Sequence, residues 1–330
     1  MKIDLVYLWV NGNDPVWKER KAKFLGQEND LINDNNCEGR FIDNDELKYS
    51  LRSVEKFAPW INNIYIITDN QKPSWLNTDH PKIHIVDHTQ ILPAHALPTY
   101  NSVAIEICLA NIPGLEEHFI YSNDDFFIGK PTTPNFFFTE DGLPIVRLNK
   151  RYFRKLSRKL KEWQGKEMTT YKKTIYYAEA LIKKRINKYY SAVPHHNMDS
   201  YQKSTYLDCI KEFQKEMDET ITHHLRTDFD VQRIIFSLYC LATNRGILKF
   251  PSRYDKKMNL AERIRRMIKK EYCSDSRLIS IDKPNIEEIF KKYSPTLFCL
   301  NDSVKVSNED RIRSKQFLEK LFPEKSSFEL

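Results

Sequence analysis

The chain has 330 residues, of which 52 are Lys or Arg and 45 are Asp or Glu, giving a net charge of +7. Its 41% apolar and 12% aromatic content is typical of a globular protein and excludes an intrinsically disordered chain. No run of 18 or more apolar residues occurs, so no membrane-spanning helix is predicted. The N-terminal sequence MKIDLVYLWVNG lacks the apolar segment and cleavage site of a signal peptide, which favours a cytoplasmic location.

The first 150 residues alternate between strand and helix patterns. Strands are predicted at Ile3–Val10, Asn63–Asn70, Lys82–His88 and His118–Asp125. Amphipathic helices are predicted at Asp45–Phe57 and Ser102–Ala110. Because strands separated by helices indicate crossover connections, we predict an α/β fold with a mainly parallel, Rossmann-like sheet.

The rest of the chain is more basic. Residues 151–292 are predicted to add a helical, basic part, and residues 293–330 to hold a late strand or loop at Pro295–Val304 and a charged tail. Two stretches, Arg147–Lys188 and Lys256–Lys270, are rich in Lys and Arg. They are interpreted either as solvated helix faces or as a surface for anionic lipid or glycan. Nucleic acid is disfavoured because no binding motif accompanies the charge.

Polar residues follow each predicted strand, at Asn11–Asp14, Asp69–Asn70, Asp87–His88 and Asn123–Asp125. In open α/β sheets the ligand crevice lies at the carboxyl ends of the strands, so these residues are candidates for a shared site. The chain contains neither GxGxxG nor GxxxxGK[ST], so neither a dinucleotide fingerprint nor a P-loop is indicated.

Two adjacent carboxylates, Asp124 and Asp125, lie within the apolar sequence FIYSNDDFFIGKP. Such a pair is costly to bury unless a positive partner meets it. With Asn123 it fits an oxygen-ligand site for Mg²⁺ or Mn²⁺, although a solvated turn is the simpler alternative. Asn301-Asp302, after a second apolar run, repeats the pattern.

The remaining candidate residues are histidine, arginine, tryptophan and cysteine. His195-His196 and His223-His224 lack HExxH spacing, so zinc is disfavoured, but a histidine is the commonest general base near neutral pH. Arg226 is a candidate for opposing phosphate charge, with a surface arginine as the alternative. The six cysteines show no CxxC spacing and are predicted to be free thiols. The residues alone thus indicate metal-assisted phosphate chemistry.

Longer segments resemble a known family. IDLVYLWVNGNDPVW (residues 3–17) and the segments 43–77 and 80–131 resemble the first two conserved regions of the Stealth family. Residues 194–232 and 298–303 resemble its third and fourth regions, although Asn197–Asp199 departs from the proline-rich stretch that the family often has there. The family comprises bacterial capsule and exopolysaccharide phosphotransferases, related to the catalytic subunit of the lysosomal-enzyme GlcNAc-1-phosphotransferase.

The resemblance implies transfer of hexose-1-phosphate or N-acetylhexosamine-1-phosphate from a UDP-sugar to a glycan hydroxyl, in cell-surface polysaccharide biosynthesis. The reaction would form a phosphodiester and release UMP, with Mg²⁺ or Mn²⁺ as cofactor. The acceptor would be a glycan or a lipid-linked oligosaccharide, and the basic helices would contact the inner membrane face peripherally. Residues 1–150 would bind the nucleotide sugar, and residues 151–292 and 293–330 would complete the same catalytic unit.

The resemblance also implies roles for single residues. His196 would be the base, with His195 left open, and Arg226 would hold the phosphoryl group, with Asp45 as a further catalytic residue. The nucleotide-sugar residues would be Trp9, Asn11, Gly12, Asp14, Asp43, Asn44 and Arg52. The metal residues would be Asn123, Asp124, Asp125 and Asp302, with Asp125 preferred over Asp124 for direct contact. Two alternatives stay open: a metal-dependent glycosyltransferase that releases UDP, and a non-catalytic glycan- or membrane-binding module.

Overall fold

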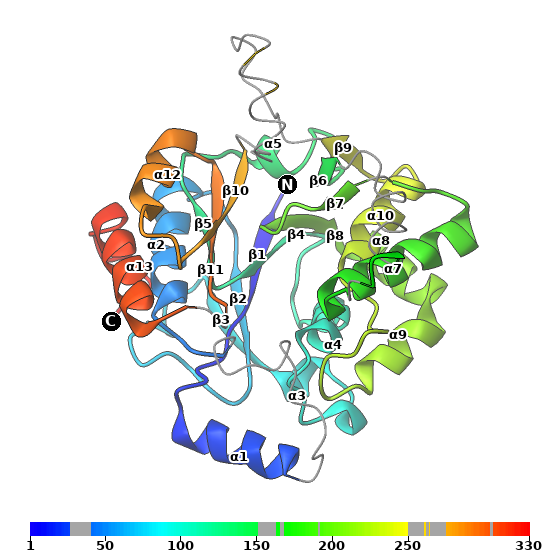
Figure 1. Ribbon diagram of the computed structural model, residues 1–330, viewed down its shortest axis with the longest axis horizontal. Helices are drawn as coiled ribbons and strands as arrows, with labels where there is room; N and C mark the ends of the chain where they lie inside the picture. Colours follow the sequence, from blue (N-terminus) through cyan, green and yellow to red (C-terminus); the bar gives the residue numbers. More distant parts are fainter. Residues whose placement is uncertain are drawn as a thin grey trace.

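A five-stranded sheet forms the centre of the protein in the computed structural model (Figure 1). Residues 1–26, 41–150, 163–165, 168–190, 192–249, 261, 264, 275–303 and 306–330 are described. The strand order is β3-β2-β1-β4-β8. These strands are β1 (Ile3–Leu8), β2 (Ile64–Thr68), β3 (Ile83–Asp87), β4 (His118–Asn123) and β8 (Asp199–Gln202).

The main sheet is mostly parallel, as predicted. β1 pairs in parallel with β2 and β4, and β2 pairs in parallel with β3. β8 alone runs antiparallel, with Tyr121 of β4 opposite Asp199. β1 and β2 are rich in Ile, Leu, Val and Tyr on both faces, which is typical of strands covered on both sides. The predicted α/β fold with a mainly parallel sheet is therefore confirmed.

Alternate side chains of the strands enter two different cores. Leu5 and Tyr7 of β1 pack with Leu47 and Leu51 of α2 (Glu46–Phe57), whereas Val6 belongs to the core on the opposite face. In Figure 1, α2, α12 (Ile286–Tyr293) and α13 (Asn308–Leu321) lie on one side of the sheet. The other side is covered by α4 (Ser102–Ile107), α7 (Thr170–Ile186), α8 (Lys203–Glu212), α9 (Gln214–Ile221) and α10 (Ile234–Ala242).

A second sheet of three strands adjoins α2. It has the order β10-β11-β5, where β10 is Ser276–Ser280, β11 is Leu297–Asn301 and β5 is Phe126–Ile128. β11 confirms the late strand expected at Pro295–Val304, and it runs parallel to β10 and antiparallel to β5. Because β5 begins directly after Asp125, the turn at Asp124 and Asp125 connects the two sheets.

The second half of the chain is not helical throughout. Besides β8, β10 and β11, it contains β7 (Ala192–Pro194) and β9 (Ile247–Lys249), which flank β6 (Ile145–Lys150) in a third sheet. The strands β7, β8, β9 and β10 are only three to five residues long, too short to show a clear two-residue periodicity. The other helices are α1 (Pro15–Leu25), α3 (His88–Ile91) and α5 (Pro134–Phe137), with 3₁₀ turns η2 (Ala94–Ala96) and η3 (Leu109–Asn111).

Several sequence predictions fall partly outside the described residues. Of the residues in Lys256–Lys270, the structure describes only Ala261 and Ile264, so the basic helix predicted there stays a prediction. Cys37 and Cys273 also lie outside, whereas Cys108, Cys209, Cys240 and Cys299 are buried free thiols. Within the described ranges, no helix has both the length and the hydropathy needed to cross a bilayer.

Candidate active site

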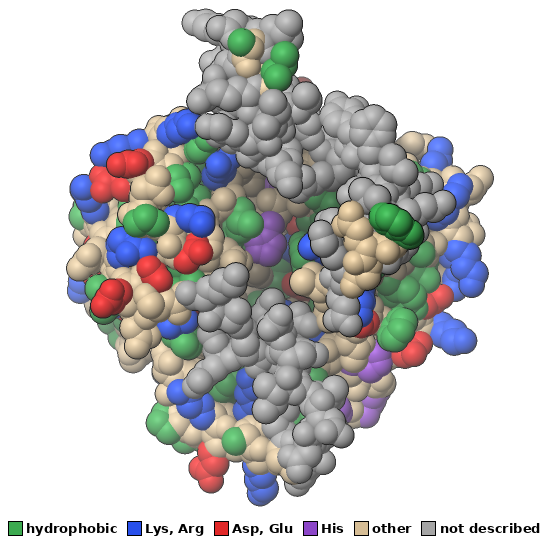
Figure 2. All heavy atoms as spheres, in the orientation of Figure 1, with side chains coloured by type: hydrophobic (Ala, Val, Ile, Leu, Met, Phe, Trp, Pro, Cys, Tyr) green, Lys and Arg blue, Asp and Glu red, His purple; other side chains and the backbone are tan. Residues whose placement is uncertain are grey.

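Several of the predicted site residues follow strands that end at the carboxyl edge of the main sheet. The last residue of β1, Leu8, lies opposite Asn123 at the end of β4, so the polar segments that follow both strands leave the sheet together. β8 begins at Asp199, opposite Tyr121, which brings the preceding His196 to the same edge. Figure 2 shows a histidine side chain at the surface, in a hollow near the middle of the face in view.

Asp124 and Asp125 are half-buried at this edge. Burial, and then the neighbouring charge of Asp125, raises the pKa of Asp124 well above its usual range. Burial raises the pKa of Asp125 to about 6, against a hydrogen bond that its Oδ2 accepts from the Cys299 thiol at 3.2 Å. The Asp125 Oδ1 atom is buried and has no hydrogen-bond partner among the described residues. Among the described residues, no ion pair is found for either carboxylate.

A second acidic group precedes and begins α2. Asp45 adopts a left-handed backbone with φ of 67°, and its backbone N–H donates to Asp43 Oδ1 at 2.9 Å. Its carboxylate pairs with Lys315 at 2.6 Å and with Lys48 at 3.2 Å. Burial alone would raise the pKa of Asp45, but these two lysines hold it below its usual value. Burial raises the pKa of the adjacent Glu46 to about 7.

Asp302 reaches the same region from β11 of the second sheet. The backbone N–H of Leu300 donates to the carbonyl of Asp125 at 3.1 Å, and the charge of Asp302 contributes to the raised pKa of Asp125. Both carboxylate oxygens of Asp302 accept hydrogen bonds from Arg311, at 2.8 and 3.3 Å. The structure therefore brings Asp302 close to Asp125, as predicted, and gives it an arginine partner that the sequence pattern did not indicate.

The donor atoms fit a hard divalent cation only in part. Among the described residues, no three His, Cys, Asp or Glu side chains converge as a complete metal-binding group. Mg²⁺, however, is commonly held by one or two carboxylates and completes its shell with water and substrate phosphates. The unpartnered Oδ1 of Asp125 and the neighbouring Asp124 provide such a pair of oxygen donors. Asn123 Oδ1 instead lies 2.7 Å from the Tyr121 hydroxyl.

A cavity of about 470 Å³ opens beside the acidic groups. Five of the predicted residues line it: Trp9, Asn11, Asp43, Asn44 and Asp45. The remaining wall comes from the segments after β1 and β2 and from α13, and consists of Asn13, Lys72, Pro73, Ser74, Trp75, Arg311, Ile312 and Lys315. The cavity thus combines two indole rings, three cations and the carboxylates of Asp43 and Asp45. Two of the cations are paired, Lys315 with Asp45 and Arg311 with Asp302. Such a lining suits a ligand that has an aromatic ring and an anionic group.

Three other predicted binding residues make contacts within the protein. A Cβ atom added to Gly12 would lie 2.1 Å from the backbone oxygen of Phe41, so the close approach that needs glycine here involves Phe41. Asp14 is the N-cap of α1 and accepts a hydrogen bond from Val16 N. Arg52, on α2, forms a bidentate ion pair with Glu329 and does not line the cavity.

The two adjacent histidines have different environments. His195 is buried, and its Nε2 atom lies 3.1 Å from the carboxylate of Asp199. His196 is half-buried and has a left-handed backbone with φ of 56°, a conformation that is strained for a non-glycine residue. The neighbouring Asn197 is also buried, so His196 is more accessible than the residues on either side of it.

Two aromatic rings contact the His196 imidazole. Phe126, the residue after Asp125, lies edge-to-face with it at 5.7 Å between ring centroids. Tyr171, in the first turn of α7, lies edge-to-face with it at 6.1 Å. These contacts restrict the orientation of the imidazole and place it next to the segment that carries the acidic pair. The sequence analysis did not single out Tyr171, because one tyrosine in a basic helical segment gives no recognisable pattern.

A buried ionic network lies behind the two histidines. Arg233 donates to Asp199 at 2.8 Å, and its Nε atom lies 3.8 Å from Glu106. Glu106 in turn lies 2.8 Å from the hydroxyl of Tyr121, the same hydroxyl that contacts Asn123. Although burial works against a charge, the nearby carboxylates keep the pKa of Arg233 well above its ordinary value. The network thus connects the histidine segment to the end of β4.

Arg226 comes from the loop between α9 and α10. Its Nη2 atom donates to the Ser102 hydroxyl at 2.6 Å, at the first residue of α4. The adjacent Leu225 packs with Trp17 and Tyr100 near the segment that follows β1. These contacts fix the Arg226 loop against the start of α4 and against α1.

Family comparisons agree with this site. The model of Stealth protein conserved region 1 matches residues 1–28, and that of conserved region 2 matches residues 40–146. Conserved region 2 therefore includes the acidic start of α2 and the Asp124–Asp125 turn. In both places the carboxyl groups influence one another's ionisation, because the charges of Asp125, Glu46 and Asp43 all raise the pKa of Asp124.

Two relatives illustrate the extent of the similarity. The capsular polysaccharide phosphotransferase SacB of Neisseria meningitidis serogroup A is 31% identical over 331 residues, which cover 99% of this chain and 57% of that protein. The receptor polysaccharide phosphotransferase WefC of Streptococcus gordonii is 48% identical over 143 residues, which cover 43% of each protein. The matched part is thus well under two thirds of either relative.

Among solved structures, the glycosyltransferase GlyE of Streptococcus pneumoniae TIGR4 resembles this chain with a TM-score of 0.45 and 9% identity, over 97% of this chain and 60% of that one. A likeness of this size carries no inference about function. Common ancestry, by contrast, can be inferred from the two matched Stealth regions and from a relative that aligns along nearly the whole chain. The chain belongs to the Stealth protein family.

Proposed function

We propose that the chain transfers a sugar-1-phosphate group from a UDP-sugar to a hydroxyl group of a glycan acceptor. The product would be a phosphodiester between two sugars, and the released nucleotide would be UMP. The similarity to SacB and WefC, which are a capsular and a receptor polysaccharide phosphotransferase, supports this reaction class and a role in cell-surface polysaccharide synthesis.

One structural observation carries the proposal. His196 and Asp125 come from distant segments that meet at the carboxyl edge of the main sheet, and Arg226 comes from a loop that contacts the start of α4. The cavity lies on the side of Asp302, because Arg311, which lines it, pairs with Asp302. Phosphoryl transfer needs a base for the attacking hydroxyl and positive charge for the phosphoryl oxygens. These residues can supply both.

In the proposed step, the acceptor oxygen forms a bond to the β-phosphorus of the UDP-sugar. The bond between that phosphorus and the oxygen that bridges to the α-phosphate breaks, and its electron pair leaves on UMP. His196 accepts the proton of the acceptor hydroxyl. Arg226 donates hydrogen bonds to the transferring phosphoryl group, and the Ser102 contact keeps its guanidinium oriented. Tyr171 and Phe126 hold the imidazole in line.

Asp124 and Asp125 would hold Mg²⁺ or Mn²⁺, with Asp302 as an outer contributor through its pair with Arg311. A bound cation supplies charge stabilisation for the diphosphate and for the leaving UMP. Its presence would also lower the cost of keeping both carboxylates ionised. This assignment supports Asp125 as the direct ligand, because its Oδ1 has no partner among the described residues.

The cavity is the proposed site of the nucleotide-sugar donor. Trp9 and Trp75 offer ring surfaces for the base, while Lys72, Arg311 and Lys315 offer positive charge for the diphosphate. The acceptor would then approach from the side of His196. We further propose that the basic stretches allow peripheral contact with the inner membrane face, where an acceptor on a lipid carrier would be available.

The nucleotide product provides the test. The protein is incubated with Mg²⁺ or Mn²⁺, a panel of UDP-sugars labelled at the β-phosphate, and oligosaccharide acceptors. Release of UMP, with the label retained in the glycan, is the expected result. Release of UDP would instead identify a glycosyltransferase, and absence of any turnover with and without metal would favour a binding module.

Two variants give the test residue-level resolution. His196→Ala is expected to lower kcat about 100- to 10,000-fold, the usual contribution of a general base, while UDP-sugar affinity stays within about twofold. His195→Gln is the matched control, because it changes the adjacent histidine, whose ring lies in the buried network with Asp199. A fully active His196→Ala protein would remove His196 from the mechanism.

A further inference from the structure

Two loops that are far apart in sequence are joined beside Arg226. The first contains residues 98–102, between η2 and α4, and the second contains residues 223–230, between α9 and α10. Asn101 Nδ2 donates to Asp230 at 2.9 Å and to the backbone oxygen of His223 at 3.1 Å. The backbone N–H of Tyr100 donates to the oxygen of His224 at 2.8 Å. The two loops therefore form one hydrogen-bonded unit.

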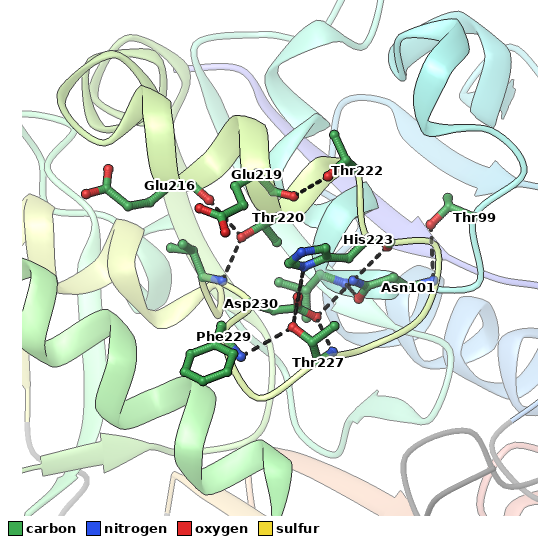
Figure 3. Close-up of polar contacts among 12 residues, drawn as sticks. Thr99, Asn101, Glu216, Glu219, Thr220, Thr222, His223, Thr227, Phe229 and Asp230 are labelled. Carbon is green, nitrogen blue, oxygen red and sulfur yellow. Dashed lines mark hydrogen bonds and ion pairs between the residues drawn. The ribbon is translucent and has the colours of Figure 1, made fainter. Parts of the chain in front are cut away.

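Asp230 is the centre of this unit, as Figure 3 shows. Its side chain has an exposed fraction of 0%. Besides the bond from Asn101, it accepts bonds from Thr227 N at 3.0 Å, from Thr227 Oγ1 at 2.8 Å and from His223 Nδ1 at 2.7 Å. Four donors fill the usual capacity of a carboxylate. They also offset the cost of burying its charge, and all of them come from the two loops.

The Asp230 contacts close the backbone around Arg226. Arg226 lies between His223 and Thr227, both of which bind the same carboxylate. The far end of the loop is also fixed, because Val231 N donates to Thr220 Oγ1 of α9 at 3.0 Å. Exchange of the carboxylate for a neutral group would therefore release both flanks of Arg226.

Asn101 connects this loop to the group that Arg226 contacts. The Asn101 side chain caps α4, because its Oδ1 accepts from Val103 N at 3.0 Å. The first residue of that helix, Ser102, receives the Arg226 guanidinium at 2.6 Å. Asn101 thus binds both the loop that carries Arg226 and the helix start that orients its side chain.

We propose that Asp230, acting with Asn101, is a positioning residue for Arg226 and hence for the phosphoryl group that Arg226 binds. This inference rests on the function proposed above. A guanidinium is a rigid fork, so its benefit to a transition state depends on its placement, and a misplacement of about 1 Å can cost about 100-fold in rate. A buried carboxylate with four donors from the two adjoining loops restricts that placement.

The first variant is Asp230→Asn, which keeps the size of the side chain and replaces two acceptor oxygens by one acceptor and one donor. We expect kcat to fall about 10- to 100-fold, with the KM for the UDP-sugar changed less than about threefold. Thr227→Val, which removes one of the four bonds, should cause a smaller loss of the same kind. It serves as the second variant if Asp230→Asn does not fold.

A double-mutant cycle separates positioning from a general structural effect. If Asp230 acts through Arg226, the Asp230→Asn/Arg226→Ala protein should have the same kcat as Arg226→Ala alone. Multiplicative losses would instead mean that Asp230 acts independently of Arg226, which would overturn the inference.

Asp4→Asn is the matched control. Asp4 is also a fully buried carboxylate, and it accepts hydrogen bonds from Asn62 Nδ2, Asn63 N and Glu116 N at 2.8 to 3.0 Å. It lies near the amino end of β1, at the opposite edge of the sheet from the site. This variant should lose stability but keep its kcat. An equal loss of kcat in Asp4→Asn and Asp230→Asn would overturn the inference.

A binding measurement distinguishes a failure of the positioning inference from a failure of the proposed function. Affinity for inorganic pyrophosphate, measured by calorimetry, should weaken in Arg226→Ala and in Asp230→Asn and stay unchanged in Asp4→Asn. If the wild-type protein forms no phosphodiester, the proposed function fails. If wild type is active and Arg226→Ala is not, but Asp230→Asn matches wild type in both kcat and pyrophosphate affinity, only the positioning inference fails.

Discussion

The ion pair between Arg52 and Glu329 allows a quantitative prediction about how the C-terminal segment is held. Arg52 Nε and Nη2 donate to the two carboxylate oxygens of Glu329, both at 2.7 Å. The side chains are only 12% and 4% exposed, respectively. Arg52 also donates to the backbone oxygen of Phe322 at 2.8 Å. Arg52 of α2 therefore binds the C-terminal segment at two points, Phe322 and Glu329.

Glu329→Gln should lower the free energy of unfolding by about 3 kcal/mol at pH 7. This is the lower end of the range for removing one partner of a buried ion pair. The lower end applies because the arginine keeps the Phe322 oxygen as an acceptor. The measurement is the denaturant midpoint in urea, combined with the slope of the transition.

The pH dependence has a defined sign. Burial works to raise the pKa of Glu329, but bonds from Arg52 and from Ser326 N hold it below its ordinary value. The stabilisation is therefore fully present above the unfolded pKa of about 4.3 and is lost as pH falls through the lower folded value. The difference in the free energy of unfolding between wild type and Glu329→Gln should be constant from pH 7 to about 5 and should become smaller at lower pH.

Glu287→Gln is the control for this prediction. Glu287 binds Lys291 and Lys320 at the surface, and pairs of this kind contribute little to stability. The denaturant midpoint of the Glu287→Gln protein should match that of wild type. An unchanged midpoint for Glu329→Gln at pH 7 would refute the reasoning. A selective loss of UDP-sugar affinity in a stably folded Glu329→Gln protein would instead favour the sequence-based expectation that Arg52 lies near the donor.

Three further predictions concern the site and its support. Gly12→Ala should destabilise the protein by about 2–3 kcal/mol in urea unfolding, because the added Cβ would overlap the Phe41 backbone. Arg233→Met should cost about 4 kcal/mol in the same assay, since it leaves two buried carboxylates without their cation; a smaller loss than for Glu329→Gln would contradict this. Tyr171→Ala should lower kcat roughly tenfold, the kinetic equivalent of one lost aromatic contact, whereas Tyr171→Phe should keep it.

The strands and helices of the first half follow from local sequence. Ile3–Val10, Asn63–Asn70, Lys82–His88 and His118–Asp125 were predicted as strands, and each contains a strand of the parallel sheet. These segments are long and apolar, so local pattern and tertiary environment agree. α1, by contrast, begins at Pro15 in a segment for which no helix is predicted above. Asp14 and Pro15 suit a helix start as well as a turn, so the local sequence does not distinguish the two.

Short strands depend on partners that the local sequence does not reveal. β5 and β8 have three and four residues, and each is stabilised by the neighbour it pairs with. The second sheet joins residues 126–128 to residues 297–301, and that pairing brings Asp302 to Asp125. The sequence showed the same Asn-Asp pattern after both apolar runs but gave no information on their separation in space.

The sequence by itself determined the α/β class, the parallel sheet and the position of polar residues after its strands, because periodicity and strand-end chemistry are local properties. The tertiary structure decided which of these residues face one another. It buried His195 against Asp199 and left His196 half-buried, paired Asp302 with Arg311 and Arg52 with Glu329, and joined two distant loops through Asp230. Such pairings depend on burial and charge between elements distant in the chain, which no local pattern encodes.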